Sequence, residues 1–333
     1  MNCCDRRKET ILLKAEVLRA VRDFMDKEGF VEEIYAGITS ATGSCESIAN
    51  IFVIKGSEQF LTLRQTAQLF LEDSITTCGL PRMYTLGRSF RKDKVGDGRH
   101  LNDFTLFEFE ALDTDLDWLV GFNKDLIEHV IQHVLQVSSR YGLLTSSQHS
   151  VLYKHWKKGI KTITYTQAID TLQAQGVTKK DGTLFAWGDD LTAVAESVLT
   201  KLHGMVQVVK YPEDIKFFNM KRSGSIGGAS ALSTSTTTAE CVDLLLPKAG
   251  ETIGGSQRED DHKLLVEKLD SSIMLKQLIV LKNEHDGAGE QARAAFDDYL
   301  KLFEDKTIVR SGAGLGLGRL LQFLTDSEGI IEF

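Results

Sequence analysis

Prolines and long apolar runs are scarce in this chain of 333 residues. Only 3 prolines occur, which argues against proline-rich linkers and disordered arms. No apolar window of about 18 residues is present, so a transmembrane helix is not expected. The opening residues, MNCCDRRKET, lack the apolar segment of a signal peptide. We therefore expect a cytoplasmic protein that does not enter a membrane.

Cysteines are few and irregularly spaced. The chain has 5 of them, an odd number, and none form a C-x-x-C pair. A disulfide framework or a zinc site is therefore not expected, and reduced thiols fit best.

An excess of positive charge is also missing, because the net charge is −8. A general nucleic-acid binder usually carries a basic face that contacts phosphates. Here the positive charge concentrates between Arg82 and His100, which suits a small polyphosphate better than a long backbone.

Hydrophobic periodicity predicts an α+β fold with an antiparallel sheet flanked by helices, and a chain of this length suits one large domain with an insert, or two domains. Alternation predicts a hairpin of strands 83–91 and 103–112 around a long charged tip. Residues 145–205 are predicted as a mainly helical insert. Further strands are expected at 51–56, 59–63, 205–212, 240–247 and near 306–310, and helices at 8–28, 65–78, 116–142 and 296–303.

The charged hairpin tip carries candidate phosphate ligands. Arg91 ends the first strand, and Arg99 and His100 precede the second. Arginine binds two phosphate oxygens at once, and Phe104 on the return strand could lie flat under a base. The alternative is an exposed charged tip with a core phenylalanine.

Two carboxylates, Asp243 and Glu251, flank a Pro-Lys-Ala-Gly turn. If the turn joins adjacent antiparallel strands, they can face one another and hold Mg²⁺ beside a triphosphate. A solvated hairpin is the alternative.

The segment GAGLGLGR (312–319) has alternating glycines and ends on Arg319. Its spacing is not G-x-G-x-x-G, and too few residues follow for the second strand of a dinucleotide fold. The glycines suit a strand over which a ligand lies flat, or one that packs tightly against a helix.

Taken together, these segments resemble motifs 2 and 3 of the class II aminoacyl-tRNA synthetases. ITYTQAID, WGDDL, KYPEDIKFFNM and DLLLPKAGETIGGSQRED extend the similarity toward the asparaginyl enzymes of the aspartyl/asparaginyl subgroup, over about residues 8–325. The resemblance implies a single catalytic domain over 1–333, built on an antiparallel sheet of six to seven strands, in a protein that is usually dimeric. The family's N-terminal anticodon-binding barrel is not seen, so recognition of tRNA through such a domain is not expected.

The resemblance also implies roles for particular residues. Arg91 would bind the α-phosphate and the substrate carboxylate, Arg99 and His100 the outer phosphates, and Phe104 the adenine. Arg319 would close over the triphosphate, and Asp243 and Glu251 would hold Mg²⁺. The amino acid would be bound by Glu46, Gln65, Gln68, Ser256 and Arg258, although Glu46 and Gln68 could also be ordinary surface or helix residues.

Several positions depart from the family pattern. Lys92 and Asp93 replace an alanine and a glutamate, and Gly318 replaces the glutamate before the motif 3 arginine. Ser47-Ile48 replaces a glycine pair, and Tyr35-Ala36 stands where Thr-Pro is expected, which leaves the dimer less secure.

The expected function is ATP- and Mg²⁺-dependent activation of aspartate or an asparagine-like acid as an acyl-adenylate. The first hypothesis for the acceptor is ammonia or a small amine, which would form an amide as in the archaeal asparagine synthetases, a stand-alone branch of this subgroup. Transfer to tRNA, a carrier protein or a protein lysine is the second hypothesis. A non-catalytic nucleotide-binding protein is the third.

Overall fold

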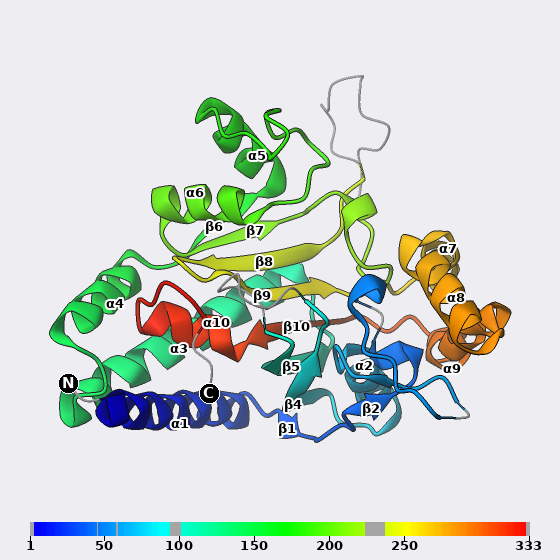
Figure 1. Ribbon diagram of the computed structural model, residues 1–333, viewed down its shortest axis with the longest axis horizontal. Coiled ribbons are helices and arrows are strands. Elements are labelled where there is room, and N and C mark those ends of the chain that lie inside the picture. Colours follow the sequence, from blue (N-terminus) through cyan, green and yellow to red (C-terminus); the bar gives the residue numbers. More distant parts are fainter. Residues whose placement is uncertain (1–2, 45, 58, 94–100, 224–236, 331–333) are drawn as a thin grey trace.

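The computed structural model describes residues 3–44, 46–57, 59–93, 101–223 and 237–330. A sheet of eight strands runs through its centre in the order β1-β4-β5-β10-β9-β8-β7-β6 (Figure 1). Its strands are β1 (Val31–Glu32), β4 (Arg82–Phe90), β5 (Asp103–Leu112), β6 (Lys161–Thr164), β7 (Val206–Val209), β8 (Cys241–Leu246), β9 (Gly250–Gln257) and β10 (Arg310–Gly316). A separate pair consists of β2 (Ile38–Thr39) and β3 (Thr62–Leu63).

The central strands, from β4 to β7, are antiparallel, whereas β1 joins β4 and β6 joins β7 in parallel. The predicted α+β class with an antiparallel sheet is confirmed. The expected count of six to seven strands is too low, because the short parallel strands β1 and β6 extend both edges.

Ten α-helices flank the sheet in the described part of the chain. In Figure 1, α5 and α6 lie above β6–β8, α1 and α4 lie below and to the left, and α7–α9 lie at the right-hand end. The helices are α1 (Cys3–Lys27), α2 (Gln68–Thr77), α3 (Leu116–Tyr141), α4 (Ser146–Lys158), α5 (Tyr165–Ala174), α6 (Ala193–His203), α7 (His262–Ser271), α8 (Ile273–Asp286), α9 (Asp297–Lys301) and α10 (Leu317–Leu324). None of the helices in the described residues is long and apolar enough to cross a membrane.

The alternating sequence FEFE in β5 places aromatic side chains on one face of the sheet and carboxylates on the other. Phe107 and Phe109 point to the face covered by α1 and α3, where the rings of Phe109 and Phe122 are 4.8 Å apart. Because neighbouring side chains of a strand point to opposite faces, Glu108 and Glu110 point to the other face. That face carries the cavity described below.

Helix α3 follows its sequence pattern closely. Asp115 caps its first turn by accepting a hydrogen bond from the Trp118 N–H at 2.9 Å, and Gly142 ends it in the left-handed conformation with φ 66°. An N-terminal cap of this kind contributes about 1 kcal/mol. Its buried stripe includes Leu119, Phe122, Leu126, Val130 and Val134.

Other sequence predictions need correction. Residues 145–205 contain α4, α5 and α6, but also β6, which joins the main sheet. In the segment predicted as strands 51–56 and 59–63, only Thr62–Leu63 forms a strand, with an isolated bridge from Val53 to Thr62. The strand predicted near 306–310 begins instead at Arg310 and runs through the glycines, because these pair with both β5 and β9.

Candidate active site

Glycines at the centre of the sheet leave a surface almost without side chains, which we call the glycine floor. Gly312 lies between Glu110 of β5 and Ser256 of β9, and Gly314 lies between Glu108 and Gly254. A Cβ placed on Gly312 would be 2.3 Å from the Glu110 Oε1, so glycine is required there for the carboxylate to fold over the strand.

A cavity of about 390 Å³ lies over this floor. From the Glu110 row to the Gly316 row, four residues of strand span about 13 Å. A cavity of this length can hold an extended ligand whose two halves bind at opposite ends. The residues that line the cavity include Glu46, Ser47, Gln68, Arg91, Asp93, Phe104, Glu108, Glu110, Lys216, Asp243, Glu251, Gly254, Arg258, Gly314, Arg319 and Ile330.

At one end of the cavity, Arg91 follows β4 directly and lies across the hairpin from Phe104. Its guanidinium carbon is 5.3 Å from the centre of the Phe104 ring, and it forms an ion pair with Glu46. These groups can bind an anion and a flat ring side by side. Arg99 and His100, predicted to assist here, lie outside the described residues.

The paired carboxylates, Asp243 and Glu251, owe their position to an irregularity between β8 and β9. Asp243 pairs with Gly254, and Glu251, three residues earlier, would point to the opposite face of a regular strand. A register shift between Leu244 and Leu245 adds one residue and turns Glu251 toward Asp243. A Cβ on Gly254 would lie 2.7 Å from the Glu251 Oε1 and 3.6 Å from the Asp243 Oδ1.

Lys216 reaches into this carboxylate pair. Its ammonium is 2.6 Å from the Asp243 Oδ2 and 3.8 Å from the centre of the Tyr211 ring. Burial acts to lower the pKa of Lys216, but Asp243, Cys241 and Glu251 together outweigh it, so the pKa is raised. Burial raises the pKa of Glu251, Asp243 raises it further, and Lys216 and Arg319 lower it. The cluster therefore concentrates negative charge beside a single lysine.

Arg319 lies in the first turn of α10, as predicted, and donates a hydrogen bond to the Glu251 carbonyl oxygen. The preceding glycine leaves room for the C-terminal segment, because a Cβ on Gly318 would be 3.0 Å from the Ile330 Cγ2. Gly318 and Ile330 both line the cavity.

At the other end of the cavity, Arg258 is held in a buried ion pair. Its Nε is 3.1 Å from the Glu110 Oε1, and its Nη1 donates to the Ser256 hydroxyl at 2.8 Å. The side chains of Arg258 and Glu110 are 3% and 1% exposed. Burial raises the pKa of Glu110, while Arg258 acts to lower it. Arg258 and Ser256, both predicted to bind the amino acid, therefore contact each other, although Ser256 is not among the residues that line the cavity.

Behind Arg258 lies Glu72 of α2, a fully buried carboxylate to which four other side chains donate hydrogen bonds. It accepts hydrogen bonds from Arg310 at 2.8 Å, Tyr299 at 2.8 Å, Asn219 at 2.6 Å and Gln68 at 3.2 Å. The Arg258 Nε is 3.9 Å from its Oε1. Glu72 thereby fixes Gln68, and its charge adds to that of Glu110.

The two glutamines predicted to bind the amino acid lie in different settings. Gln68 lines the cavity, whereas the Gln65 amide is occupied with the Ser47 backbone, at 3.1 Å to its N–H and 2.9 Å to its carbonyl. Gln65 thus holds the loop next to Glu46. Among the departures from the family pattern, Asp93 lines the cavity and accepts from the Asn50 amide at 2.8 Å, whereas Lys92 is exposed.

Glu72 and Lys216 were missed in the sequence, as was the role of Glu110 as the partner of Arg258. Glu108 lies in the cavity wall and accepts from the Ala67 N–H at 3.0 Å and from the Thr66 hydroxyl. A signal existed for the glutamates, since each interrupts an apolar segment. Glu72 follows Leu69-Phe70-Leu71, and Glu108 and Glu110 alternate with buried phenylalanines.

The arrangement of an antiparallel sheet, a glycine floor and arginines from two distant segments defines a nucleotide-binding core of the class II synthetase type. The family model "tRNA synthetases class II (D, K and N)" matches residues 3–333. The chain therefore belongs to this family.

Among its relatives, the chain is 30% identical to the asparagine–tRNA ligase of Pyrococcus furiosus, over 96% of this chain and 65% of the relative. It is 31% identical to that of Thermococcus kodakarensis, over 94% of this chain and 64% of the relative. The chain thus spans a little under two thirds of these curated relatives. The structure of Pyrococcus horikoshii asparaginyl-tRNA synthetase complexed with asparaginyl-adenylate is similar, with a TM-score of 0.78, 29% identity and coverage of 98% of this chain and 67% of that chain.

Proposed function

We propose that this protein activates an amino acid with ATP, forming an enzyme-bound acyl-adenylate and pyrophosphate. The observation that supports this most is the cavity itself. Arg91, Phe104 and Arg319 gather at one part of it and the Arg258–Glu110 pair at another, over one glycine floor. An acyl-adenylate needs such a site, with a pocket for the acid and another for the nucleotide.

Within this proposal, Arg91 binds the α-phosphate and Arg319 the outer phosphates. Negative charge develops on the α-phosphate as the carboxylate oxygen attacks, and guanidinium groups stabilise it. No covalent nucleophile on the enzyme is required, so catalysis consists of positioning and electrostatics. Phe104 stacks on the adenine.

Asp243 and Glu251 are the residues that would hold Mg²⁺. No group of three metal-ligating side chains occurs among the described residues. Two carboxylates nevertheless suit Mg²⁺, which is bound by one or two carboxylates together with phosphate oxygens and water. The ion would neutralise the phosphate charge.

The charge of the amino-acid pocket favours asparagine over aspartate. Arg258 and Arg310 are matched by Glu110 and Glu72 within one buried network. A substrate carboxylate would add an unmatched negative charge there, which is costly away from water. A neutral carboxamide can instead accept from Arg258 and donate to Glu110.

A preference for asparagine changes which acceptor of the activated amino acid is expected. Ammonia-dependent synthesis of asparagine requires aspartate as the activated acid, so it becomes the second candidate. If asparagine is activated, the acceptor is a tRNA end, a carrier protein or a protein lysine. Of these we favour tRNA, because the curated relatives are asparagine–tRNA ligases.

A homodimer is part of the proposal. Three isoleucine or valine side chains in and after β1 are exposed, with 43% for Val31, 78% for Ile34 and 55% for Ile38. They would be covered by a second copy. Sedimentation equilibrium of the wild type and of an Ile34→Glu, Ile38→Glu variant would test this, and a wild-type monomer at micromolar concentration would contradict it.

Amino-acid-dependent ATP–pyrophosphate exchange tests the main proposal. We expect exchange with asparagine, and a loss of at least about 100-fold in Arg91→Ala and in Arg319→Ala. Arg88→Ala is the matched control, because Arg88 lies on β4, the strand that Arg91 follows, but pairs with Asp103 at 2.5 Å outside the cavity. Absence of exchange with every amino acid tried, or full exchange in either cavity variant, would refute the assignment.

A further inference from the structure

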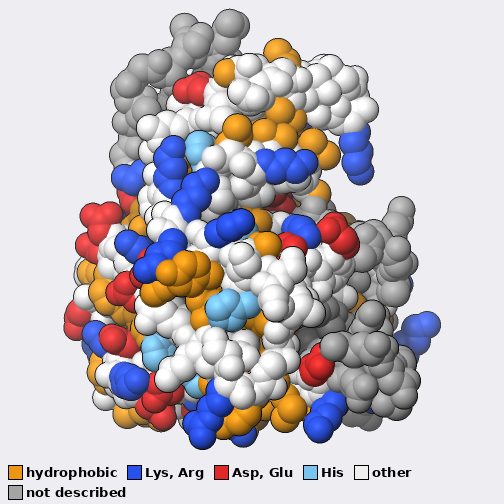
Figure 2. Space-filling view, turned by 90° about the vertical axis from the view of Figure 1, so that its left-hand side faces the viewer, with side chains coloured by type: hydrophobic (Ala, Val, Ile, Leu, Met, Phe, Trp, Pro, Cys, Tyr) orange, Lys and Arg blue, Asp and Glu red, His pale blue; other side chains and the backbone are white. Residues whose placement is uncertain are grey.

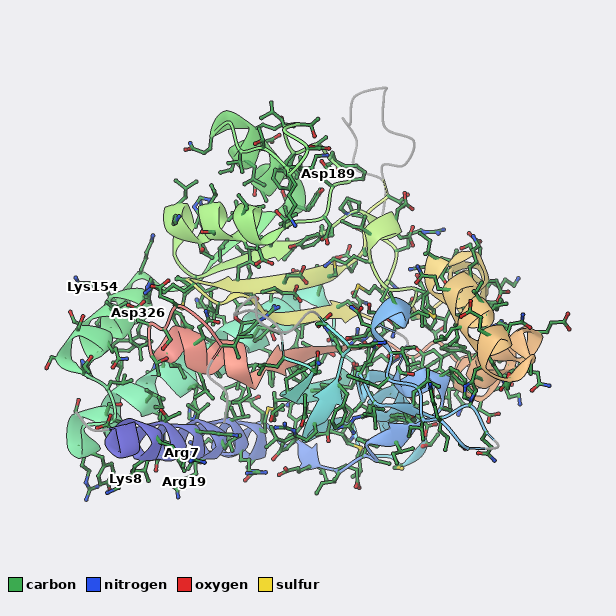
Figure 3. The ribbon with its side chains drawn as sticks, in the orientation of Figure 1. Arg7, Lys8, Arg19, Lys154, Asp189 and Asp326 are labelled. Atoms are coloured by element: carbon green, nitrogen blue, oxygen red, sulfur yellow. The ribbon has the colours of Figure 1, made fainter. Side chains whose placement is uncertain are left out.

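A basic surface lies where α4, β6 and the end of α6 meet, away from the cavity. Its lysines follow one another on the exposed side of α4 and the segments beside it. We call this surface the α4 basic face, and its lysines are Lys154, Lys157, Lys158, Lys161 and Lys201. In Figure 3, Lys154 lies at the outer edge of α4.

The charges of the α4 basic face are not neutralised. Among the described residues, none of its five lysines forms an ion pair with an aspartate or glutamate. Lysines elsewhere do so, for example Lys248, which lies 2.9 Å from both Asp326 and Glu328. Asp326 approaches α4 but is therefore already paired. Figure 2, which views this side of the molecule, shows Lys and Arg side chains gathered across its middle.

His203 is affected by this positive charge. The Lys161 ammonium is 3.4 Å from the His203 Nδ1. Burial lowers the pKa of His203, and Lys161 and Lys158 lower it further. Although the net charge of the chain is −8, no aspartate or glutamate of the described residues forms an ion pair with these lysines. The α4 basic face therefore gathers five unpaired lysines of the described chain on one surface.

Two aromatic rings adjoin the lysines. The Lys157 ammonium is 4.3 Å from the centre of the Trp156 ring and 5.5 Å from that of Tyr153. The two rings are 5.7 Å apart, and Tyr153 is 45% exposed. Lysines that follow a backbone, next to a ring on which bases can stack, are the elements of a single-stranded nucleic-acid surface.

From these observations we infer that the α4 basic face binds single-stranded RNA, with the lysines on phosphates and Tyr153 against a base. RNA is favoured over an acidic protein because the exposed ring offers stacking as well as charge. The inference goes beyond adenylation and does not depend on it, because none of these residues lines the cavity.

The test is fluorescence anisotropy with a labelled, unstructured 20-nucleotide RNA, titrated with the full chain between 50 and 200 mM salt. The variant is Lys157→Gln, Lys158→Gln, Lys161→Gln. Each phosphate contact to a single strand contributes about 0.7 to the salt slope. We expect about 100-fold weaker binding near ~0.1 M salt and a slope reduced by about 2.

The matched control is Lys263→Gln, Lys276→Gln, Lys306→Gln, which removes the same charge from exposed positions outside the α4 basic face. It should keep most of the affinity. An equal loss in the control, or wild-type affinity in the first variant, would overturn the inference, as would failure of the wild type to bind. Equal competition by polyglutamate would point to an acidic protein instead of RNA. Pyrophosphate exchange, measured in parallel, reports on adenylation separately.

Discussion

The Arg258–Glu110 pair allows the proposed amino-acid preference to be tested by one substitution. Glu110→Gln keeps the size of the side chain and one carbonyl acceptor, but removes the charge. Arg258 would retain Ser256 at 2.8 Å and Glu72 at 3.9 Å, and its own side chain is 3% exposed. The buried network would then carry one excess positive charge.

The expected size of the effect follows from this burial. Removing one partner of a buried ion pair costs about 3–5 kcal/mol. Because the introduced carboxamide can still accept a hydrogen bond, we expect the lower end, about 3 kcal/mol. The preference between the two amino acids should also change, away from asparagine and toward aspartate. Two unit charges about 4 Å apart interact by about 4 kcal/mol at an effective dielectric constant near 20. The excess positive charge should therefore favour aspartate over asparagine by at least about tenfold relative to wild type.

Two assays measure these effects. Urea denaturation gives the free energy of unfolding, and pyrophosphate exchange gives kcat/KM for asparagine and for aspartate. Glu267→Gln is the control, because Glu267 is exposed and pairs weakly with Arg222 at 3.8 Å. It should change stability by less than about 1 kcal/mol. Glu110→Asp, which keeps the charge, should keep the asparagine preference even if packing is lost. A Glu110→Gln enzyme with wild-type stability and an unchanged substrate ratio would refute the charge argument.

Two further predictions concern the floor and the carboxylate pair. Gly312→Ala should lower the free energy of unfolding by about 1–3 kcal/mol and weaken pyrophosphate exchange, because the added Cβ would lie 2.3 Å from the Glu110 carboxylate. The control is Gly121→Ala, in open space within α3, which should leave the free energy of unfolding unchanged or raise it. Urea denaturation measures both variants. Lys216→Met should tighten binding of Mn²⁺ to the nucleotide-free protein by at least about tenfold, because the ammonium 2.6 Å from Asp243 competes with the ion. Electron paramagnetic resonance of free Mn²⁺ measures this, and unchanged or weaker binding would mean that the pair does not hold the metal.

Much of the fold follows from local patterns in the sequence. The β4–β5 hairpin and α3 have strong signals, because alternation and helical periodicity persist over nine to twenty-six residues. The short strands β1 and β6 have four residues or fewer, so periodicity could not identify them. They exist because the neighbouring strands β4 and β7 offer free edges.

For the site too, a residue could be predicted where its signal lies in the local sequence. Arg91, Phe104, Arg319 and the two carboxylates lie in segments with a distinctive local sequence, so their approach could be predicted. A local sequence pattern cannot show which buried charges pair with each other when the two residues are far apart in the sequence. Glu72 and Arg310 are 238 residues apart and meet at 2.7 Å, and Glu110 and Arg258 are 148 residues apart. Each of these charges would be unstable alone in the core, so each implies a partner. The rule that a buried charge must be matched predicts that partners exist, but only the fold selects them. In the proposed amino-acid pocket, that selection decides whether the pocket is neutral, and therefore which amino acid we expect it to accept.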